Sequence, residues 1–391
     1  MKTILFNTDS LIMGGAEKLA IDYVKVLSRD YKVILLVNED NGKEGNILEK
    51  DIPENIEYEF IVDKTIMDNI NKYRKLKQKY KKNLWYRIRY NYFLKQRRKS
   101  FKKNIINYVK NKKYDVLIDF NNKLPIEIID NRVISWFHSS LTGMKVKQKE
   151  KYAEKFKKIK KVVVINNDMM KEFSEYFPNN LDKVERIYNF FDIEEIKKKS
   201  VDSSLLNDKE KEKLNEKYIV ACCRLDKKKD VETLIAAFSN LKMNKSIKEK
   251  LYIIGDGDNR RNLEVLAKKL NVLEDIIFLG TQKNPYIWMK NAEFFVHSSY
   301  KEGFGMVLVE AMITNGLVVS SDCPVGPREI LEDGKSGILV KPQDIPEMEK
   351  ALFEMMTNKE TQNIKKENSQ KRMLDFSLEY NYPMIKNIIE N

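Results

Sequence analysis

The chain has 391 residues, of which 42% are hydrophobic and 33% are charged, and its formal net charge at pH 7 is +14. This length predicts two domains of ordinary size, and the apolar content is sufficient for a core in each. Because no apolar run reaches 18 residues and the N-terminal segment soon turns polar, we expect a cytoplasmic protein without a transmembrane helix or signal peptide.

Short apolar runs alternate with helical patterns along the first half, which is typical of a parallel α/β sheet. Gly14-Gly15-Ala16-Glu17 follows the first expected strand, and apolar residues then recur on one face of a helix over residues 19–27. Asp168 is expected near the N-terminus of a later helix. The strands expected here are Thr3–Asn7, Lys32–Val37, Tyr58–Val62, Asp115–Phe120, Arg132–Phe137 and Lys161–Ile165.

The positive charge is concentrated in one stretch of this half. Residues 69–114 contain 18 Lys and Arg and no Asp or Glu, so the rest of the chain is net negative. Basic helices with aromatic residues suit an anionic membrane surface. A solvated helical face and a site for a polyanionic acceptor such as a teichoic acid are the alternatives. Nine aromatics are interspersed with the cations: Tyr73, Tyr80, Trp85, Tyr86, Tyr90, Tyr92, Phe93, Phe101 and Tyr108.

A polar, highly charged stretch at residues 206–217 separates the halves, and we place the domain boundary close to Ser200. The second half repeats the alternation, with helical patterns over Val231–Phe238 and Asn262–Leu270. Residues 373–391 are expected to form a helix that packs back on the first domain. The strands expected in this half are Tyr218–Cys223, Leu251–Ile254, Ile276–Leu279, Ala292–His297, Leu317–Ser320 and Gly337–Val340.

This pattern predicts two doubly wound, Rossmann-like α/β domains in tandem. We assign residues 1–200 to the first domain, with a basic insertion at 69–114, residues 201–372 to the second, and residues 373–391 to the C-terminal helix. Ligands of such domains usually bind outside the carboxyl ends of the strands. The loops at Gly14-Gly15, after Arg224 and after Glu302 are therefore expected to line a cleft.

The segment Arg224-Leu225-Asp226-Lys227-Lys228-Lys229-Asp230 directly follows an expected strand and leads into a helix. Arg offers a planar fork of donors and Lys a point charge, so this position suits a diphosphate. A solvated turn is the alternative, because one third of the chain is charged.

The segment from Lys301 to Met312 carries two carboxylates eight positions apart, Glu302 and Glu310. Gly303 and Gly305 disfavour one continuous helix between them, since each glycine costs about 1 kcal/mol relative to Ala in a helix interior. We expect a loop that carries Glu302, followed by a helix with Glu310 on its second turn. Peptide N–H groups in such a loop can approach an anion, and paired acceptors suit sugar hydroxyls.

Together these motifs resemble the retaining glycosyltransferases of family 4, which have the GT-B fold. The resemblance covers residues 220–340 in order and spacing and is looser in the first half. It rests on Arg224 with Lys229, Gly255-Asp256-Gly257, the segment from Glu302 to Glu310, and Cys323-Pro324-Val325-Gly326-Pro327-Arg328-Glu329-Ile330-Leu331; in the first half it rests on Gly14-Gly15-Ala16-Glu17, the strand that ends in His138, and Tyr188-Asn189-Phe190-Phe191-Asp192.

The resemblance implies a role for each of these residues. Arg224 and Lys229 hold the donor diphosphate as it leaves, Glu302 accepts from the transferred sugar, and Glu310 takes the ribose hydroxyls. His138 contacts the sugar, and Gly14 and Gly15 let the first domain approach the diphosphate. The nucleotide base rests near Thr281 and Gln282. The N–H groups over Gly303, Phe304, Gly305, Met306 and Val307 face the sugar and phosphates.

The reaction implied is transfer of a hexose or N-acetylhexosamine from a nucleotide sugar, most simply a UDP-sugar, with retention of anomeric configuration. No cofactor is required, and two cations on the diphosphate make a divalent metal unnecessary. The expected acceptor is a lipid-linked or polymeric glycan of bacterial surface polysaccharide or capsule synthesis. Residues 72–113 would then hold the enzyme on the anionic inner leaflet of the plasma membrane. A polyanion- or nucleic-acid-binding protein is the alternative, although no recognition motif supports a nucleic-acid partner.

Four polar positions have two interpretations each. His138 is either a satisfied core residue or the sugar contact that the resemblance implies. His297 is interpreted as strand packing or support for a neighbouring site residue. Asp256-Gly257-Asp258 matches an Asp-x-Asp metal motif, yet the glycines suit a tight turn and Asp258 suits an N-cap. Glu329 either borders the sugar pocket with Gly326 or caps a helix. Three cysteines without Cys-x-x-Cys spacing and only two histidines argue against a structural zinc site.

Overall fold

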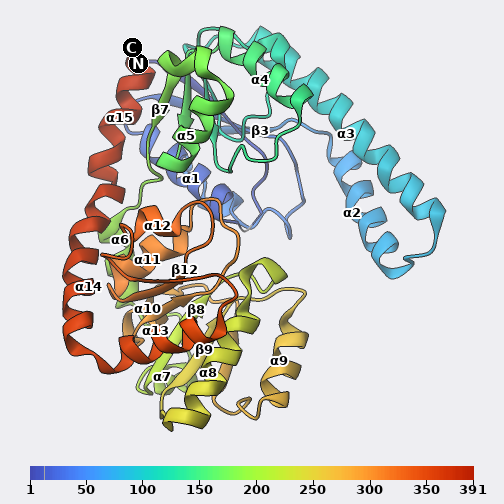
Figure 1. Cartoon of the computed structure of the whole chain (residues 1–391). Coiled ribbons are helices and arrows are strands. Elements are labelled where there is room, and N and C mark those ends of the chain that lie inside the picture. Colours follow the sequence, from blue (N-terminus) through green and yellow to red (C-terminus); the bar gives the residue numbers. More distant parts are fainter. Residues whose placement is uncertain (13) are drawn as a thin grey trace. The chain divides into compact units, whose positions relative to one another are not determined.

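The computed structural model describes residues 1–12 and 14–391 and divides the chain into two compact units (Figure 1). Unit 1 comprises Met1–Ile165 and Met169–Arg186, and unit 2 comprises Asn166–Asp168 and Ile187–Asn391. By its contacts the segment 187–200 goes with unit 2, although the sequence analysis places it in the first domain. The reason is that α6 (Ile193–Ser200) packs on α10 (Tyr286–Asn291) and α11 (Met306–Thr314).

A parallel sheet forms the centre of unit 1, with its seven strands in the order β3-β2-β1-β4-β5-β6-β7. The six predicted strands are present, and β7, whose residues are Val-Glu-Arg, was not predicted. The strands are β1 (Thr3–Thr8), β2 (Lys32–Val37), β3 (Glu57–Phe60), β4 (Val116–Asp119), β5 (Val133–Phe137), β6 (Lys161–Val164) and β7 (Val184–Arg186). The helices are α1 (Gly15–Leu27), α2 (Lys64–Lys79), α3 (Leu84–Asn111), α4 (Val146–Lys158) and α5 (Asn167–Tyr176), with 3-10 turns η1 (Glu49–Asp51), η2 (Ile126–Ile128) and η3 (Pro178–Lys183).

Aromatic side chains join the sheet of unit 1 to α1. The rings of Phe6 and Phe120 lie 5.1 Å apart, and those of Tyr23 and Trp136 lie 5.7 Å apart in an edge-on arrangement. All four side chains are fully buried. This packing fixes β1, β4 and β5 against α1, and so fixes the start of the loops that leave the carboxyl ends of these strands.

A buried ion pair attaches α4 to the same sheet. Lys155 Nζ lies 2.7 Å from Asp119 Oδ2, and the two side chains are 4% and 0% exposed. Asp119 also accepts hydrogen bonds from the backbone N–H groups of Lys123 and Leu124, while Lys155 donates to Asn122. Both charges therefore have polar neighbours in place of the water they lost.

The basic insertion forms a helical hairpin of α2 and α3, which Figure 1 shows extending away from the sheet of unit 1. Side chains of Asp63 and Asn83 cap the two helices by accepting from the N–H groups of Thr65 and Trp85. At the base of the hairpin, Met67 packs in a small core to which Ile66, Ile70, Tyr90, Phe93, Leu94 and Phe101 also belong.

Unit 2 is built on a second parallel sheet, whose six strands follow the order β10-β9-β8-β11-β12-β13. All six predicted strands are present. They are β8 (Tyr218–Cys222), β9 (Lys250–Ile254), β10 (Ile276–Gly280), β11 (Phe295–His297), β12 (Val318–Ser321) and β13 (Ile338–Val340). Besides α6, α10 and α11, the helices are α7 (Asp208–Lys213), α8 (Val231–Lys245), α9 (Arg260–Lys269), α12 (Pro327–Ile330), α13 (Ile345–Thr357), α14 (Lys359–Arg372) and α15 (Leu378–Glu390), with turns η4 (Lys227–Lys229) and η5 (Met373–Phe376).

The C-terminal segment is helical as predicted, over α15, and it groups with unit 2 by its contacts. Its packing on the first domain stays a prediction. Among residues 1–12 and 14–391, no helix combines the length and apolar content that crossing a membrane requires.

Candidate active site

The topology of unit 2 explains why two distant loops meet. β8 and β11 are parallel neighbours in the sheet, although their last residues, Cys222 and His297, are 75 positions apart in the sequence. The order of the strands reverses between them, which is where doubly wound sheets bind ligands. The loop that begins at Arg224 follows β8, and the loop that carries Glu302 follows β11, so both leave the same edge of the sheet.

An ion pair joins the two loops. Lys229 Nζ lies 2.5 Å from Glu302 Oε1, and the side chains are 21% and 12% exposed. The backbones are tied together as well: Ser298 Oγ donates to the Lys229 carbonyl at 2.9 Å, and the Tyr300 N–H donates to the Lys228 carbonyl at 3.1 Å. A cation and a carboxylate that the sequence analysis assigned to one site are therefore in direct contact.

His297 supports Glu302 from the end of β11. Its Nε2 lies 2.8 Å from Glu302 Oε1, and its Nδ1 lies 3.0 Å from Ser320 Oγ on β12. A carboxylate oxygen can only accept, so Nε2 must carry the hydrogen. This contact makes His297 a positioning residue for Glu302. Its position at the end of a strand, five residues before a candidate carboxylate, was the only signal in the sequence.

The surroundings keep Glu302 ionised. Burial alone would raise the pKa of this carboxyl, but the hydrogen bond and charge of His297 and the charge of Lys229 outweigh burial and lower the pKa to about 2. Both contacts fall on Oε1. The second oxygen, Oε2, has no hydrogen bond within the described residues, so it is available to accept from a ligand hydroxyl.

Arg224 lies in the same loop but has a different partner. Its guanidinium donates to Asp226 Oδ2 through Nε and Nη2, each at 2.8 Å, and its side chain is 75% exposed. Asp226 also accepts from the Lys228 N–H at the start of η4. Because Arg224 is exposed, an anion can reach its remaining donors without breaking any buried contact.

The loop after Glu302 ends in a helix without a side-chain cap. Gly305 is the N-cap of α11 and has φ 95°, a left-handed value that favours glycine. In the described structure no side chain caps this N-terminus, so the N–H groups of Met306 and Val307 are placed for an anion. Glu310 lies on the second turn, as predicted, and its Oε1 accepts from Tyr286 of α10 at 2.9 Å.

Phe304 anchors the same loop in unit 2. Its side chain is 5% exposed, and its ring lies 6.3 Å from that of Tyr188 and 5.9 Å from that of Phe376. Gly326, with φ 107°, passes so close that a Cβ there would lie 1.9 Å from the Phe304 carbonyl oxygen. The Gly303 carbonyl accepts from Asn166 Nδ2 at 3.4 Å. The loop conformation thus depends on several separate contacts.

Glu329 has a capping contact, as one interpretation of the sequence expected, and also a contact with a hydroxyl that neither interpretation expected. Its carboxylate accepts from the Tyr188 hydroxyl at 2.6 Å and from the Asn167 N–H, at the first residue of α5, at 2.7 Å. Arg372 donates to the Glu329 carbonyl at 2.9 Å and to the Tyr188 hydroxyl at 3.3 Å. Glu329 does cap a helix, but the helix is α5 and not its own α12.

The turn after β9 is shaped by close backbone contact. A Cβ on Gly255 (φ 120°) would lie 1.9 Å from the Cys223 carbonyl oxygen, so only glycine fits where this turn passes the end of β8. Asp256 pairs with Arg260 at 3.3 Å. The N-cap of α9 is Asn259, not Asp258 as expected. Within the described residues no three His, Cys, Asp or Glu side chains are grouped for a metal ion.

Thr281 and Gln282 follow β10 at the edge of the sheet, two strands away from β8. Thr281 is exposed. Gln282 Nε2 donates to the Leu279 carbonyl at 3.0 Å and to Glu210 Oε1 of α7 at 3.4 Å. These contacts fix the loop expected near the base, and none of them joins it to Glu302.

The remaining predicted site residues belong to unit 1. Gly14 is the N-cap of α1 and has an extended backbone, and the space that a Cβ of Gly15 would fill is open within 4 Å. His138 directly follows β5, and its ring lies 4.3 Å from that of Phe120. Burial lowers the pKa of His138 to about 4, and its Nε2 has no hydrogen-bond partner in the described structure. The imidazole is therefore neutral at pH 7.

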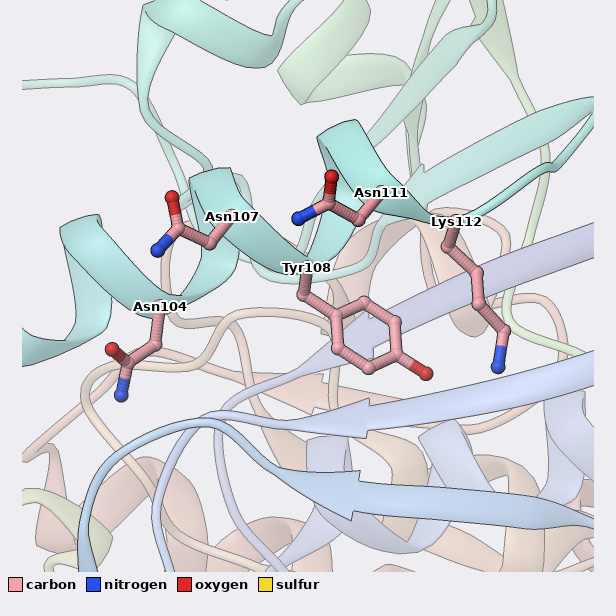
Figure 2. Close-up of a pocket in the computed structure, with 5 residues that line it drawn as sticks. All are labelled: Asn104, Asn107, Tyr108, Asn111 and Lys112. Carbon is pink, nitrogen blue, oxygen red and sulfur yellow. The ribbon is translucent and has the colours of Figure 1, made fainter.

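A separate hollow of about 380 Å³ lies along the C-terminal end of α3 in unit 1. Figure 2 shows the residues that line it, which are Asn104, Asn107, Tyr108, Asn111 and Lys112. Lys112, which lines it, pairs with Glu57 of β3 at 2.7 Å. No predicted site residue lines this hollow, and we assign it no ligand.

Comparison with known proteins finds similarity in the second half of the chain. Residues 203–372 match the family model described as glycosyl transferases group 1. A Campylobacter jejuni enzyme named N-acetylgalactosamine-N,N'-diacetylbacillosaminyl-diphospho-undecaprenol 4-alpha-N-acetylgalactosaminyltransferase is 36% identical over 174 residues, which are 44% of each chain. An uncharacterized glycosyltransferase of Methanocaldococcus jannaschii is 29% identical over 288 residues, 66% of this chain and 70% of that one. The chain thus spans less than half the length of the first of these relatives.

Solved structures resemble the whole chain. Anabaena HepE, crystallised in complex with UDP and glucose, superposes with a TM-score of 0.74 at 18% identity over 100% of both chains. WaaG, a glycosyltransferase involved in lipopolysaccharide biosynthesis, superposes with a TM-score of 0.71 at 14% identity over 99% of both. These likenesses confirm the predicted fold class, two Rossmann-like domains of the GT-B type.

Proposed function

Residues 203–372 form a domain of the glycosyl transferases group 1 family, and from this premise we propose that the protein is a retaining glycosyltransferase that uses a UDP-sugar. The observation that carries the proposal is the contact of Lys229 and His297 with Glu302 Oε1, which leaves Oε2 open beside an uncapped helix N-terminus. Such a site offers an acceptor to sugar hydroxyls and donors to phosphates.

In the proposed reaction, the bond between the anomeric carbon and the diphosphate oxygen breaks, and a bond from that carbon to the acceptor oxygen forms. Arg224 and Lys229 neutralise the charge that develops on the leaving diphosphate, as do the N–H groups at the start of α11. The leaving phosphate oxygen takes the proton of the acceptor hydroxyl, so no protein base is required. Glu302 orients the transferred sugar, and Glu310 holds the ribose.

We propose a lipid-linked or polymeric glycan as acceptor, with the basic hairpin on the anionic inner leaflet of the membrane. Two features support this part. The name of the Campylobacter relative contains an undecaprenol-linked substrate. Residues 69–114 contain 18 Lys and Arg, and no Asp or Glu within that stretch compensates their charge. Anionic lipid headgroups attract such a segment.

The test is a screen of the purified protein against UDP-hexoses and UDP-N-acetylhexosamines, scored by UDP release and by protection from thermal unfolding. We expect one of these donors to raise the melting temperature and to be hydrolysed slowly without acceptor. If RNA or polyphosphate stabilised the protein and no nucleotide sugar did, the polyanion-binding alternative would replace this proposal.

Metal independence is part of the same proposal. Because we propose that Arg224 and Lys229 supply the two positive charges that the leaving diphosphate needs, we expect transfer to proceed at an unchanged rate in excess EDTA. The measurement is the initial rate of UDP release with EDTA or with MgCl₂. Loss of activity in EDTA that magnesium restores would contradict it.

A further inference from the structure

The distal part of the α2–α3 hairpin, residues 76–92, exposes several large apolar side chains. Two of them also contact other rings of the hairpin: the ring of Trp85 lies 5.7 Å from that of Tyr73 of α2, and the ring of Tyr80 lies 5.5 Å from that of Tyr86. Leu84, Ile88 and Tyr92 are 66%, 56% and 48% exposed and follow one another at intervals of four residues, so they form a stripe along α3. Trp85, 51% exposed, lies beside the stripe, and Tyr80, 44% exposed, lies at the adjoining end of α2. Isolated exposed apolar residues are ordinary, but a contiguous group indicates a binding surface.

This stripe is not the face with which the hairpin holds itself together. The side of α3 that packs on the base of α2 carries Tyr90, Phe93, Leu94 and Phe101. At 100° per residue, these positions lie on roughly the opposite side of the helix from Leu84, Ile88 and Tyr92. The sequence therefore provides α3 with a second apolar face, and this face is confined to the first third of the helix.

The charges around the stripe differ from those at the base of the hairpin. Three cations nearer the base of the hairpin pair with carboxylates of unit 1: Arg97 and Lys102 of α3 pair with Glu39 and Glu127, and Lys112, the C-cap of α3, pairs with Glu57. In the described structure, no carboxylate pairs with the cations of the distal part, which are Lys77, Lys79, Lys81, Lys82, Arg87 and Arg89. Three of them lie near aromatic rings, with Lys77 over Tyr90 at 4.6 Å. The distal part is both apolar and uniformly positive.

We propose that the distal part of the hairpin inserts into the interface of an anionic lipid bilayer, with Leu84, Trp85, Ile88 and Tyr92 below the level of the phosphates. The unpaired cations remain at that level and select anionic lipid. This proposal deepens the membrane part of the proposed function and rests on it for its biological meaning. A bilayer is the surface that offers negative charge and an apolar layer directly beneath it, whereas a soluble polyanion offers only the charge.

The chain carries its own reporter for this insertion. Of its three tryptophans, Trp136 and Trp288 are fully buried in the two units, and only Trp85 is exposed. Intrinsic fluorescence that changes on contact with lipid therefore reports on the hairpin. Brominated acyl chains quench tryptophan at short range, so quenching distinguishes insertion from adsorption on the headgroups.

The experiment adds the full-length protein to vesicles of phosphatidylcholine, with or without phosphatidylglycerol, that contain brominated phosphatidylcholine. We expect a blue shift and quenching with the anionic vesicles, and neither with phosphatidylcholine alone. Trp85→Phe should remove the quenching while the protein still co-sediments. The double variant Leu84→Ser, Ile88→Ser should bind at low salt, lose the quenching, and be released at salt concentrations that leave the wild type bound, a loss of about tenfold or more in partitioning.

Val265→Ser is the control for loss of an exposed apolar side chain in a basic helix, because Val265 is 62% exposed on α9, which carries four cations but lies in unit 2 and outside the hairpin. It should behave as the wild type. Binding of the wild type to vesicles without quenching would contradict insertion and indicate adsorption on the headgroups. If the wild type and the double variant bound polyphosphate equally and neither bound vesicles, the ligand would be a soluble polyanion. UDP protection from thermal unfolding is measured on the same samples, so failure of the donor site and failure of insertion are separate results.

Discussion

At the scale of single residues, the candidate site is defined by the two side chains that donate to Glu302. Lys229 and His297 both donate to Oε1, and together they hold the carboxylate in one orientation. Burial makes the loss of either donor costly, because an ionised carboxylate that loses its partner in a low-dielectric site is strongly disfavoured. The side chain is therefore fixed before any ligand arrives, and its second oxygen needs no rearrangement to accept a hydroxyl.

Glu302→Gln tests the charge of this group. The amide has the same size and its oxygen can still accept, but it carries no negative charge, and the NH2 group that replaces Oε2 cannot accept from a sugar hydroxyl. We therefore expect kcat/KM for sugar transfer to fall by at least about 100-fold. Lys229→Met should cause a comparable loss because it removes positive charge from the leaving group. Near-UV circular dichroism checks that both variants are folded. Activity within a few-fold of wild type in either variant would contradict the assigned roles.

The pKa of His138 predicts how the stability of the fold depends on pH. Its pKa of about 4 in the folded protein lies below the usual 6.5, so the unfolded chain binds the proton first as the pH falls. The stability that the neutral imidazole contributes is complete above pH 6.5 and is lost as the pH falls from 6.5 to about 4. Over this range the free energy of unfolding falls by at most about 3 kcal/mol. His138→Gln does not titrate and should flatten that part of the curve. Melting temperatures at pH 7 and pH 5 measure it, and parallel shifts in the two proteins would count against it.

At the scale of elements, the loop between β11 and α11 depends on the turn before α12. Gly326→Ala places a Cβ 1.9 Å from the Phe304 carbonyl oxygen, so either the loop or α12 must move. We expect a loss of stability about 2 kcal/mol larger than that of a control, together with loss of UDP protection. The control is Gly334→Ala, which has a similar φ of 90° and no atom closer than 3.8 Å. Thermal unfolding with and without UDP separates them, and equal behaviour would dismiss the coupling.

Local sequence signals predicted most of these elements. Apolar runs bounded by polar residues identified the buried strands, and the two glycines around Phe304 placed the break between the Glu302 loop and α11, where Gly305 has a positive φ. β7 was missed because its three residues, Val184–Arg186, have no apolar run and are recognised as a strand only by pairing with β6. Local pattern was sufficient for the strands that carry an apolar run, the edge strands β3, β10 and β13 included, and it failed at the edge strand β7, which has none.

Contacts between distant residues could not be predicted in this way. Arg372 reaches Tyr188 across 184 positions, and Tyr188 reaches Glu329 across 141. Nothing in the residues around Glu329 indicates that its partners are a hydroxyl and a backbone N–H from earlier segments. The contact of His297 with Glu302 spans only five positions, but it depends on where β11 ends. The residue types of the site were readable from sequence, whereas the residues that position them required the fold.

At the scale of the whole molecule, the charge is divided unevenly between the units. The hairpin of unit 1 holds 18 cations, while the rest of the chain is net negative. An anionic surface therefore attracts the hairpin and repels much of the remainder, which orients the protein as it approaches. The orientation weakens with salt, because the Debye length falls to about 8 Å at physiological ionic strength.

Neutralising four of these cations tests that asymmetry. Replacing Lys77, Lys79, Lys81 and Lys82 by Gln should weaken binding to phosphatidylglycerol vesicles by at least about 100-fold, since each cation near the surface contributes about 1 kcal/mol. The control replaces four lysines of unit 2, Lys209, Lys211, Lys213 and Lys217, and so changes the net charge equally. Co-sedimentation at several salt concentrations measures both. A similar loss in the two variants would show that total charge matters and its location does not.

The buried pair of Asp119 and Lys155 has a consequence for how this sequence can change over time. Substituting either partner alone leaves the other charge buried without a partner and lowers the free energy of unfolding by about 3–5 kcal/mol. An apolar pair of similar volume is tolerated. Neutral drift at one position is therefore blocked until the second changes with it. Among homologous chains we expect the two positions to covary, as acid with lysine or as two hydrocarbons, and seldom as a mixture.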